Sequence, residues 1–235
     1  MDVMDVINSN DDKELIDKII ALEWEMFVSV NEGEDKASCQ EDYGTFLGMR
    51  EAQFSSWSAE TAASYLSDLE TAQSENRNLI EAKYIHMMKP TEPSKYEALI
   101  KKVKVLDAQA EALAREVSDL LLEQTRILFE DYPYVAGQGR PLYSTLDYAA
   151  VSIETYQLGE LLTYSAGTLT ALKEHIISLS GNGVSLARLI LEKSVGYYGY
   201  ASLDKAEAAT KERAEKMGIQ VSFGCCPDGE CDVEF

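Results

Sequence analysis

Apolar residues recur at helical spacing along nearly the whole chain, and this pattern restricts the fold more than any other feature. No stretch alternates apolar and polar residues as a half-buried strand does. The most regular stretch is 93–131, where apolar positions follow steps of four and three over about four heptads. Its seam comprises Leu99, Val103, Leu106, Ala110, Leu113, Val117, Leu120, Gln124 and Ile127. The sequence therefore predicts an all-α fold.

Turn and capping signals divide the chain into expected helices. The short linker KPTEP (89–93) joins a helix over 58–88 to the one over 93–131, so these two should form a long antiparallel hairpin. Serines at suitable positions predict helix starts, Ser38 in a capping box with Glu41, and Gly218 predicts the end of the last helix. The other expected helices cover 12–30, 37–57, 144–162, 184–197 and 202–217, and the stretch 165–179 either continues the helix over 144–162 or starts a new one. N-caps are expected at Ser58, Ser144 and Ser202. We expect a bundle of about seven helices.

The same signals suggest a domain organisation. The stretch YPYVAGQGRPLY (132–143) is the clearest break, with two prolines and two glycines. We expect a single helical domain over 1–221, with sub-layers 12–131 and 144–217, followed by an acidic, cysteine-rich tail over 222–235.

Charge and cysteine usage exclude several classes of partner. The net charge of -20 argues against binding to nucleic acid or to an anionic membrane surface, because both need clustered Lys and Arg. The acidic start MDVMDVINSNDDKELI lacks the basic and apolar regions of a signal peptide. No run approaches the roughly 18 apolar residues of a membrane-spanning helix. Four cysteines in 235 residues are not a disulfide framework, so we expect a cytoplasmic protein.

Several charged side chains fall on apolar helix faces. They are Glu23, Arg50, Lys83, Asp147 and Glu154. Leaving one member of a buried ion pair without its partner costs roughly 3–5 kcal/mol, so five isolated buried charges would be hard to tolerate. We therefore expect these side chains to converge in one internal cluster of two cations and three acids.

Such a cluster has a structural and a functional interpretation. It could be an ion-pair network that fixes helix register, or a small-molecule site between helices. In the second interpretation Glu23 and Glu154 are the acid/base groups and Arg50 supplies a planar fork for a carboxylate or phosphate. Lys83 is a candidate base or Schiff-base nucleophile. Further candidate ligand-binding residues are Asn76, Asp147 and Tyr143.

Cys39 and the two histidines are less specific. Cys39 is either a small buried hydrophobe or a catalytic thiolate near a helix N-terminus, where the helix dipole and Arg50 would lower its pKa. His86 and His175 lie off the apolar faces, and we expect both to be exposed. Neither has a Glu three residues before it, so the pattern of a di-iron carboxylate bundle is not met.

The tail GCCPDGECDVEF (224–235) holds Cys225, Cys226 and Cys231. Thiolates of this kind suit zinc, iron or copper, although a closed tetrahedral site would need a fourth ligand from elsewhere. The alternative is a disordered acidic tail with exposed thiols.

Two long stretches resemble a known family. LEWEMFVSVNEGEDKASCQEDYGTFLGMREAQFSSW and GRPLYSTLDYAAVSIETYQLGELLTYS resemble the uncharacterised bacterial family of domain of unknown function 4125, and the likeness spans most of 20–205. The resemblance implies a helical, cytoplasmic bacterial protein of a kind found largely in anaerobes, and it implies no particular activity. These stretches contain Glu23, Cys39, Arg50 and Glu154.

Two functional hypotheses follow from the sequence. The first is a cytoplasmic enzyme or binding protein for a small anionic metabolite held by the buried carboxylate, Arg and Lys cluster. The alternative is a metal-binding, redox or interaction protein that uses the C-terminal cysteines. The heptad seam over 99–127 serves either the intramolecular hairpin or a homo-oligomer, and the pattern leaves both open.

Overall fold

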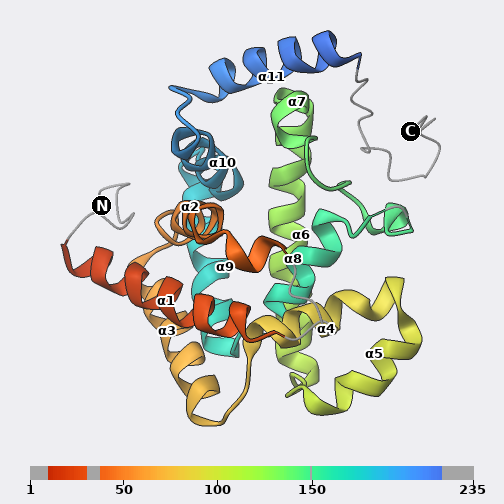
Figure 1. The fold of residues 1–235 in the computed structure, drawn as a ribbon. Coiled ribbons are helices and arrows are strands. Elements are labelled where there is room, and N and C mark those ends of the chain that lie inside the picture. The colour runs from red at the N-terminus through yellow and green to blue at the C-terminus, as the bar shows by residue number, and fades with distance from the viewer. Residues whose placement is uncertain (1–9, 31–37, 149, 219–235) are drawn as a thin grey trace.

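The computed structural model describes residues 10–30, 38–148 and 150–218 (Figure 1). This part of the chain forms eleven α-helices and three short 3-10 helices, and it contains no strand. The predicted all-α class is therefore confirmed, with more and shorter helices than the sequence suggested. No helix in the described ranges is long and apolar enough to cross a membrane.

The first helices follow the expected order but begin at different residues. The sequence predicts one helix over 37–57, whereas the structure has a 3-10 turn and then a separate helix. The separation arises at Asp42, whose carboxylate accepts a hydrogen bond from the Thr45 amide at 3.0 Å and caps the second element. Ser58 caps the next helix as predicted. The elements are α1 (Asn10–Val28), η1 (Ser38–Glu41), α2 (Tyr43–Phe54) and α3 (Ala59–Ser74).

Both long helices of the expected hairpin are divided. Asn76, with a left-handed φ of 52°, turns the chain after α3, and Asn78 caps the following helix. The expected helix over 93–131 is interrupted because Val103 is extended and Asp107 accepts hydrogen bonds from the amides of Gln109 and Ala110. These elements are α4 (Leu79–Thr91), α5 (Pro93–Leu99), η2 (Ile100–Lys102) and α6 (Ala108–Asp131). Instead of forming a hairpin with each other, α4 packs against α5 and α8, and α6 packs against α8, α9 and α10.

The second half of the chain also starts its helices at capping residues. Ser152, rather than Ser144, caps the helix that contains Glu160. Ser202 and Gly218, which has a φ of 66°, bound the last helix as predicted. The elements are α7 (Pro133–Ala136), η3 (Ser144–Leu146), α8 (Ile153–Leu161), α9 (Ala166–Gly181), α10 (Leu186–Tyr197) and α11 (Leu203–Met217).

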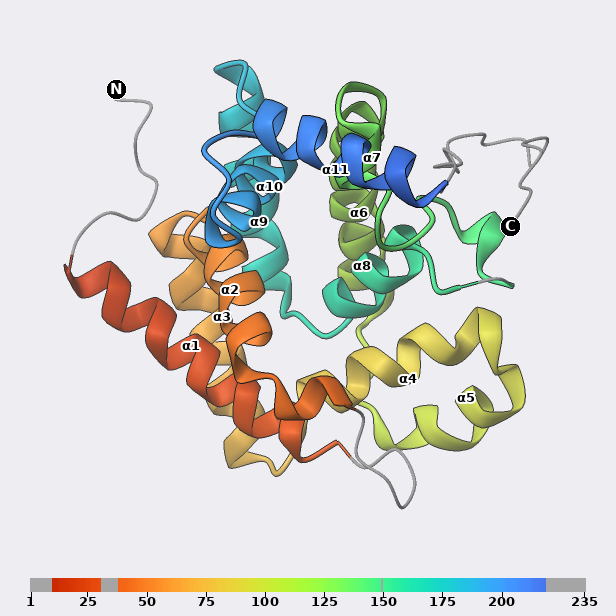
Figure 2. The same ribbon diagram turned by 45° about the horizontal axis from the view of Figure 1, so that its top comes forward.

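The helices enclose one large apolar core and one small one. The large core draws on both halves of the chain, because α3 packs against α1 and α9, and α4 against α8. In the small core, Val195 of α10 packs with Leu203 and Ala206 of α11. Helix α11 lies across the top of the molecule, over α10 and α7 (Figures 1 and 2). The cysteine-rich tail lies outside the described residues, and the division into one domain and a tail stays a prediction.

Candidate functional site

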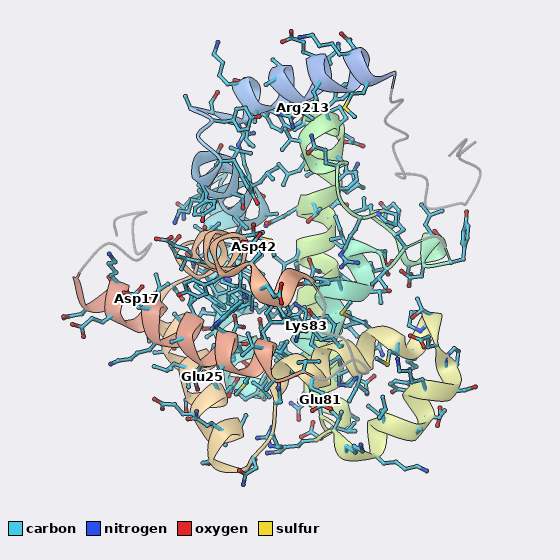
Figure 3. All side chains as sticks on the ribbon, viewed as in Figure 1. Asp17, Glu25, Asp42, Glu81, Lys83 and Arg213 are labelled. Carbon is cyan, nitrogen blue, oxygen red and sulfur yellow. The ribbon has the colours of Figure 1, made fainter. Side chains whose placement is uncertain are left out.

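Four helices each place one charged side chain in the interior. Glu23 comes from α1, Arg50 from α2, Lys83 from α4 and Glu160 from α8. Their exposed fractions are 0 %, 5 %, 4 % and 7 %. Figure 3 shows Lys83 near the middle of the molecule, whereas Glu25, on the same helix as Glu23, is exposed. The four side chains form a buried network of two cations and two carboxylates, which we call the ion-pair network.

Arg50 is the centre of the ion-pair network. Its Nε donates to Oε2 of Glu23 at 2.5 Å, and its Nη2 donates to the other oxygen of the same carboxylate. The guanidinium also contacts Glu160, with Nη2 at 3.3 Å from Oε1. Lys83 Nζ donates to Glu160 Oε2 at 2.5 Å and lies 3.6 Å from the centre of the Tyr156 ring. Each cation therefore has a carboxylate within hydrogen-bond reach.

Three neutral side chains complete the ion-pair network. Gln53 accepts from Arg50 Nη1 at 2.8 Å and donates to Glu160 Oε1 at 2.9 Å. The hydroxyl of Tyr65 donates to Glu23 at 2.7 Å, and that of Tyr164 donates to Glu160 at 2.8 Å. The buried carboxylates are thus satisfied by hydrogen bonds as well as by charge, which buried ion pairs require.

The network shifts the pKa values of Glu160, Arg50, Tyr65 and Tyr164. Burial alone would raise the pKa of Glu160, but the charges of Arg50 and Lys83 outweigh it and hold the pKa well below its usual value. Burial would likewise lower the pKa of Arg50, yet Glu160 and Glu23 keep that pKa well above its usual value. Burial and a nearby carboxylate, Glu23 for Tyr65 and Glu160 for Tyr164, raise the pKa of both hydroxyls well above the usual value. At neutral pH the carboxylate of Glu160 is charged and both phenols are protonated.

The structure brings together three of the five charges that the sequence placed inside, Glu23, Arg50 and Lys83. Glu154 lies elsewhere, partly buried in the first turn of α8, where it accepts a hydrogen bond from the Ser144 amide at 2.7 Å. Asp147 is buried but accepts from the Ser152 amide at 2.7 Å, so it holds the start of α8. The expectation that these two acids join the cluster is wrong.

Glu160 is the member that the sequence reasoning missed. Glu154 and Glu160 are the two acids between Tyr148 and Leu172, and Glu154 was expected inside because it shares a helical face with Asp147, which in the structure lies before α8. With the true start after Ser152, Glu154 lies in the first turn of α8, from where its carboxylate accepts from the Ser144 amide at the start of η3. Tyr164, which donates to Glu160, lies beyond the end of α8, so helical spacing gave no signal for this pair.

The remaining candidates lie apart from the network. Asn76 is exposed at the turn between α3 and α4, and Tyr143 is partly buried just before η3. The backbone of Cys39 belongs to η1, and its side chain lies outside the described residues, as do Cys225, Cys226 and Cys231. Within the described ranges no group of three His, Cys, Asp or Glu side chains could hold a metal ion.

The histidines are partly buried, contrary to expectation. His175 Nε2 lies 3.0 Å from the carbonyl oxygen of Ser56. His86 Nε2 is buried and has no hydrogen-bond partner among the described residues. Burial lowers the pKa of both imidazoles. Neither histidine contacts the ion-pair network through a described hydrogen bond.

A cavity of about 300 Å³ borders the ion-pair network. Its walls come mainly from α6, α8 and α10 and are mostly apolar, with Trp57, Phe129 and Ile190 among them. Gln53 and Glu160 line the cavity and belong to the network at the same time. We call this space the apolar cavity. It combines apolar walls with a few fixed polar groups, as small-molecule sites do.

The fold and this site define an all-α protein with an apolar cavity beside a buried ion-pair network. Residues 13–208 match the family described as "Protein of unknown function (DUF4125)", and the chain belongs to that family. The resemblance seen in the sequence is thereby confirmed. No curated protein and no solved structure matches the chain.

Proposed function

We propose that this protein binds a small organic molecule in the apolar cavity. The observation that carries the proposal is the shared wall: Gln53 and Glu160 line a cavity of about 300 Å³ and are held by the ion-pair network behind them. Rigidly supported polar groups at one end of an apolar space give a ligand orientation as well as affinity.

The contacts favour a ligand with an apolar body and a weakly polar end. The sequence suggested an anionic metabolite gripped by Arg50 and Lys83. In the structure those cations are already paired with Glu23 and Glu160, and an anion entering from the cavity would meet the Glu160 carboxylate first. A neutral aromatic or branched aliphatic compound that donates one hydrogen bond fits this environment better.

The same contacts favour binding over acid/base catalysis at the network. A general acid or base works best with a pKa near the working pH. The cations hold the pKa of Glu160 well below its usual value, and burial raises that of Tyr164 well above it. The ion-pair network therefore serves to position the cavity wall.

A neutral fluorescent probe tests the proposal. We expect 1-aminoanthracene to bind with increased fluorescence, and Ala187→Leu, which adds volume to the cavity wall, to weaken its binding by about tenfold. Ala208→Leu, on the exposed side of α11, is the matched control and should bind as the unmodified protein does. Equal binding by both variants would show that the probe does not occupy the cavity.

The alternative hypothesis, metal binding or interaction through the C-terminal cysteines, stays a prediction. Cys225, Cys226 and Cys231 lie outside the described residues, and no described contact favours it over the apolar cavity.

A further inference from the structure

We propose a second, separate site that binds the phosphate or diphosphate group of a small molecule, in a polar pocket between the start of α4 and residues 102–104. This pocket has a volume of about 210 Å³. The side chains that matter in it are those of Asn76, Arg77, Asn78, Lys102, Lys104 and Thr163. We call it the anion pocket, and it is independent of the apolar cavity and of the function proposed for that cavity.

The charge around the anion pocket is opposite to that of the chain as a whole. Residues 89–104 contain five lysines and two glutamates, a net charge of +3, in a chain whose net charge is -20. In a strongly acidic protein, a local group of cations beside a pocket is a place where an anion is attracted instead of repelled. Arg77, on the other wall of the pocket, adds a further positive charge.

The cations of the pocket are only partly neutralised. Arg77 is paired with Glu75 through both Nε, at 2.7 Å, and Nη2, at 2.5 Å, and no hydrogen bond from its Nη1 to a described residue is seen. Hydrogen bonding from Arg77 and the charges of Arg77 and Lys104 lower the pKa of Glu75, so Lys104 lies close enough to Glu75 to affect it. Lys102 and Lys104 form no ion pair with any described residue. Glu81 is the acid in the lining, so the charged lining residues sum to +2, from three cations and one carboxylate.

The backbone geometry supports the same assignment. Asn76 adopts a left-handed φ of 52°, a conformation that costs free energy for a residue with a side chain. This turn directs the chain so that Arg77 and Asn78 stand at the N-terminus of α4, a helix of 13 residues. The partial positive charge of this helix N-terminus, where the Asn78 side chain already accepts from the Glu81 amide, adds to that of the cations. Asn76, a ligand-binding candidate from the sequence, therefore lines this pocket and not the ion-pair network.

The chemistry of the pocket selects a compact, multiply charged anion. Guanidinium and ammonium donors of this kind hold phosphate oxygens through charge-assisted hydrogen bonds. A second pocket of about 560 Å³ shares Arg77, Lys104 and Thr163 with it, so a phosphate group in the anion pocket leaves room beside it for the rest of a ligand.

Calorimetry with inorganic pyrophosphate at low salt tests the proposal on the full chain. We expect binding by the unmodified protein and an affinity about tenfold weaker for Arg77→Gln and for Lys104→Gln. The matched control is Lys101→Gln, which removes a neighbouring exposed lysine that does not line the pocket, and it should change affinity less than twofold. Lys104 is exposed, so its replacement should leave the fold intact, which circular dichroism checks.

Two results would overturn the proposal. One is the absence of pyrophosphate binding by the unmodified protein. The other is an equal loss of affinity in Lys101→Gln, which would mean diffuse attraction to the lysines. The variant Ala187→Leu should bind pyrophosphate normally, so a failure of the anion pocket and a failure of the apolar cavity give different results.

Discussion

At the residue scale, the ion-pair network shows which charges the sequence could place and which it could not. Glu23, Arg50 and Lys83 were predicted to lie inside because each falls on the apolar face of a helix whose phase is clear. Glu160 was missed because the buried face was assigned with Asp147 on it, and Asp147 lies before α8 begins at the Ser152 cap. Helical spacing therefore identifies buried charges only where the residues compared belong to one helix.

The difference between the two acids of α8 gives a prediction for stability. Glu160→Gln should lower the free energy of unfolding by roughly 3–5 kcal/mol, because it leaves Arg50 and Lys83 buried with one carboxylate between them. Glu154→Gln should cost less than about 1 kcal/mol, because an amide oxygen can still accept from Ser144. Urea unfolding measures both. Similar costs for the two variants would contradict a buried network centred on Glu160.

At the scale of the helix, capping residues determined the boundaries more strongly than apolar spacing did. The heptad pattern of 93–131 continues through 100–107, yet Asp107 starts a new helix there by accepting two backbone amides. Asp42 and Ser152 act in the same way for α2 and α8. A capping side chain satisfies amides that would otherwise lack partners, which favours a helix start even within a periodic stretch. Within α6 the seam residues Ala110 and Val117 are buried, whereas Ile127 at the far end is exposed. A homo-oligomer through the seam stays a prediction.

The packing of α2 against α10 gives a prediction for Gly48. A Cβ at this position would lie 2.5 Å from the ring of Tyr197, whose hydroxyl is fixed by a 2.7 Å hydrogen bond to the Gly44 carbonyl. Gly48→Ala should therefore lower the free energy of unfolding by about 1 kcal/mol, despite the higher helix propensity of alanine.

A double-mutant cycle checks the cause of this cost. In a Tyr197→Ala background the steric conflict is absent, so Gly48→Ala should be neutral or stabilising by up to about 1 kcal/mol. The same destabilisation in both backgrounds would show that contact with Tyr197 is not responsible.

At the scale of the whole molecule, the two cores differ in size and should differ in stability. The large core joins helices from both halves of the chain, whereas α11 is held over α7 and α10 by the small core beneath it. Glu207 strengthens this attachment by accepting from the amides of Tyr134 and Val135 at 2.9 and 2.8 Å. Elements with few buried apolar contacts open more readily than the rest of a protein.

Hydrogen exchange measured by mass spectrometry tests this ranking. The amides of α11 should exchange faster than those of α3 and α9 under native conditions, because α11 can detach without opening the large core. Glu207→Gln should speed exchange in α7 and α11 and leave α3 and α9 unchanged. A uniform rate across all helices would mean that the molecule opens as one unit.

The long sequence separations within the ion-pair network have a consequence for folding cooperativity. Arg50 meets Glu23 across 27 positions and Glu160 across 110, and Lys83 meets Glu160 across 77. In a folding intermediate without α8, Lys83 either stays hydrated or is buried without its carboxylate partner. Burying it unpaired costs several kcal/mol. Such intermediates are therefore sparsely populated, and the four distant segments become stable together.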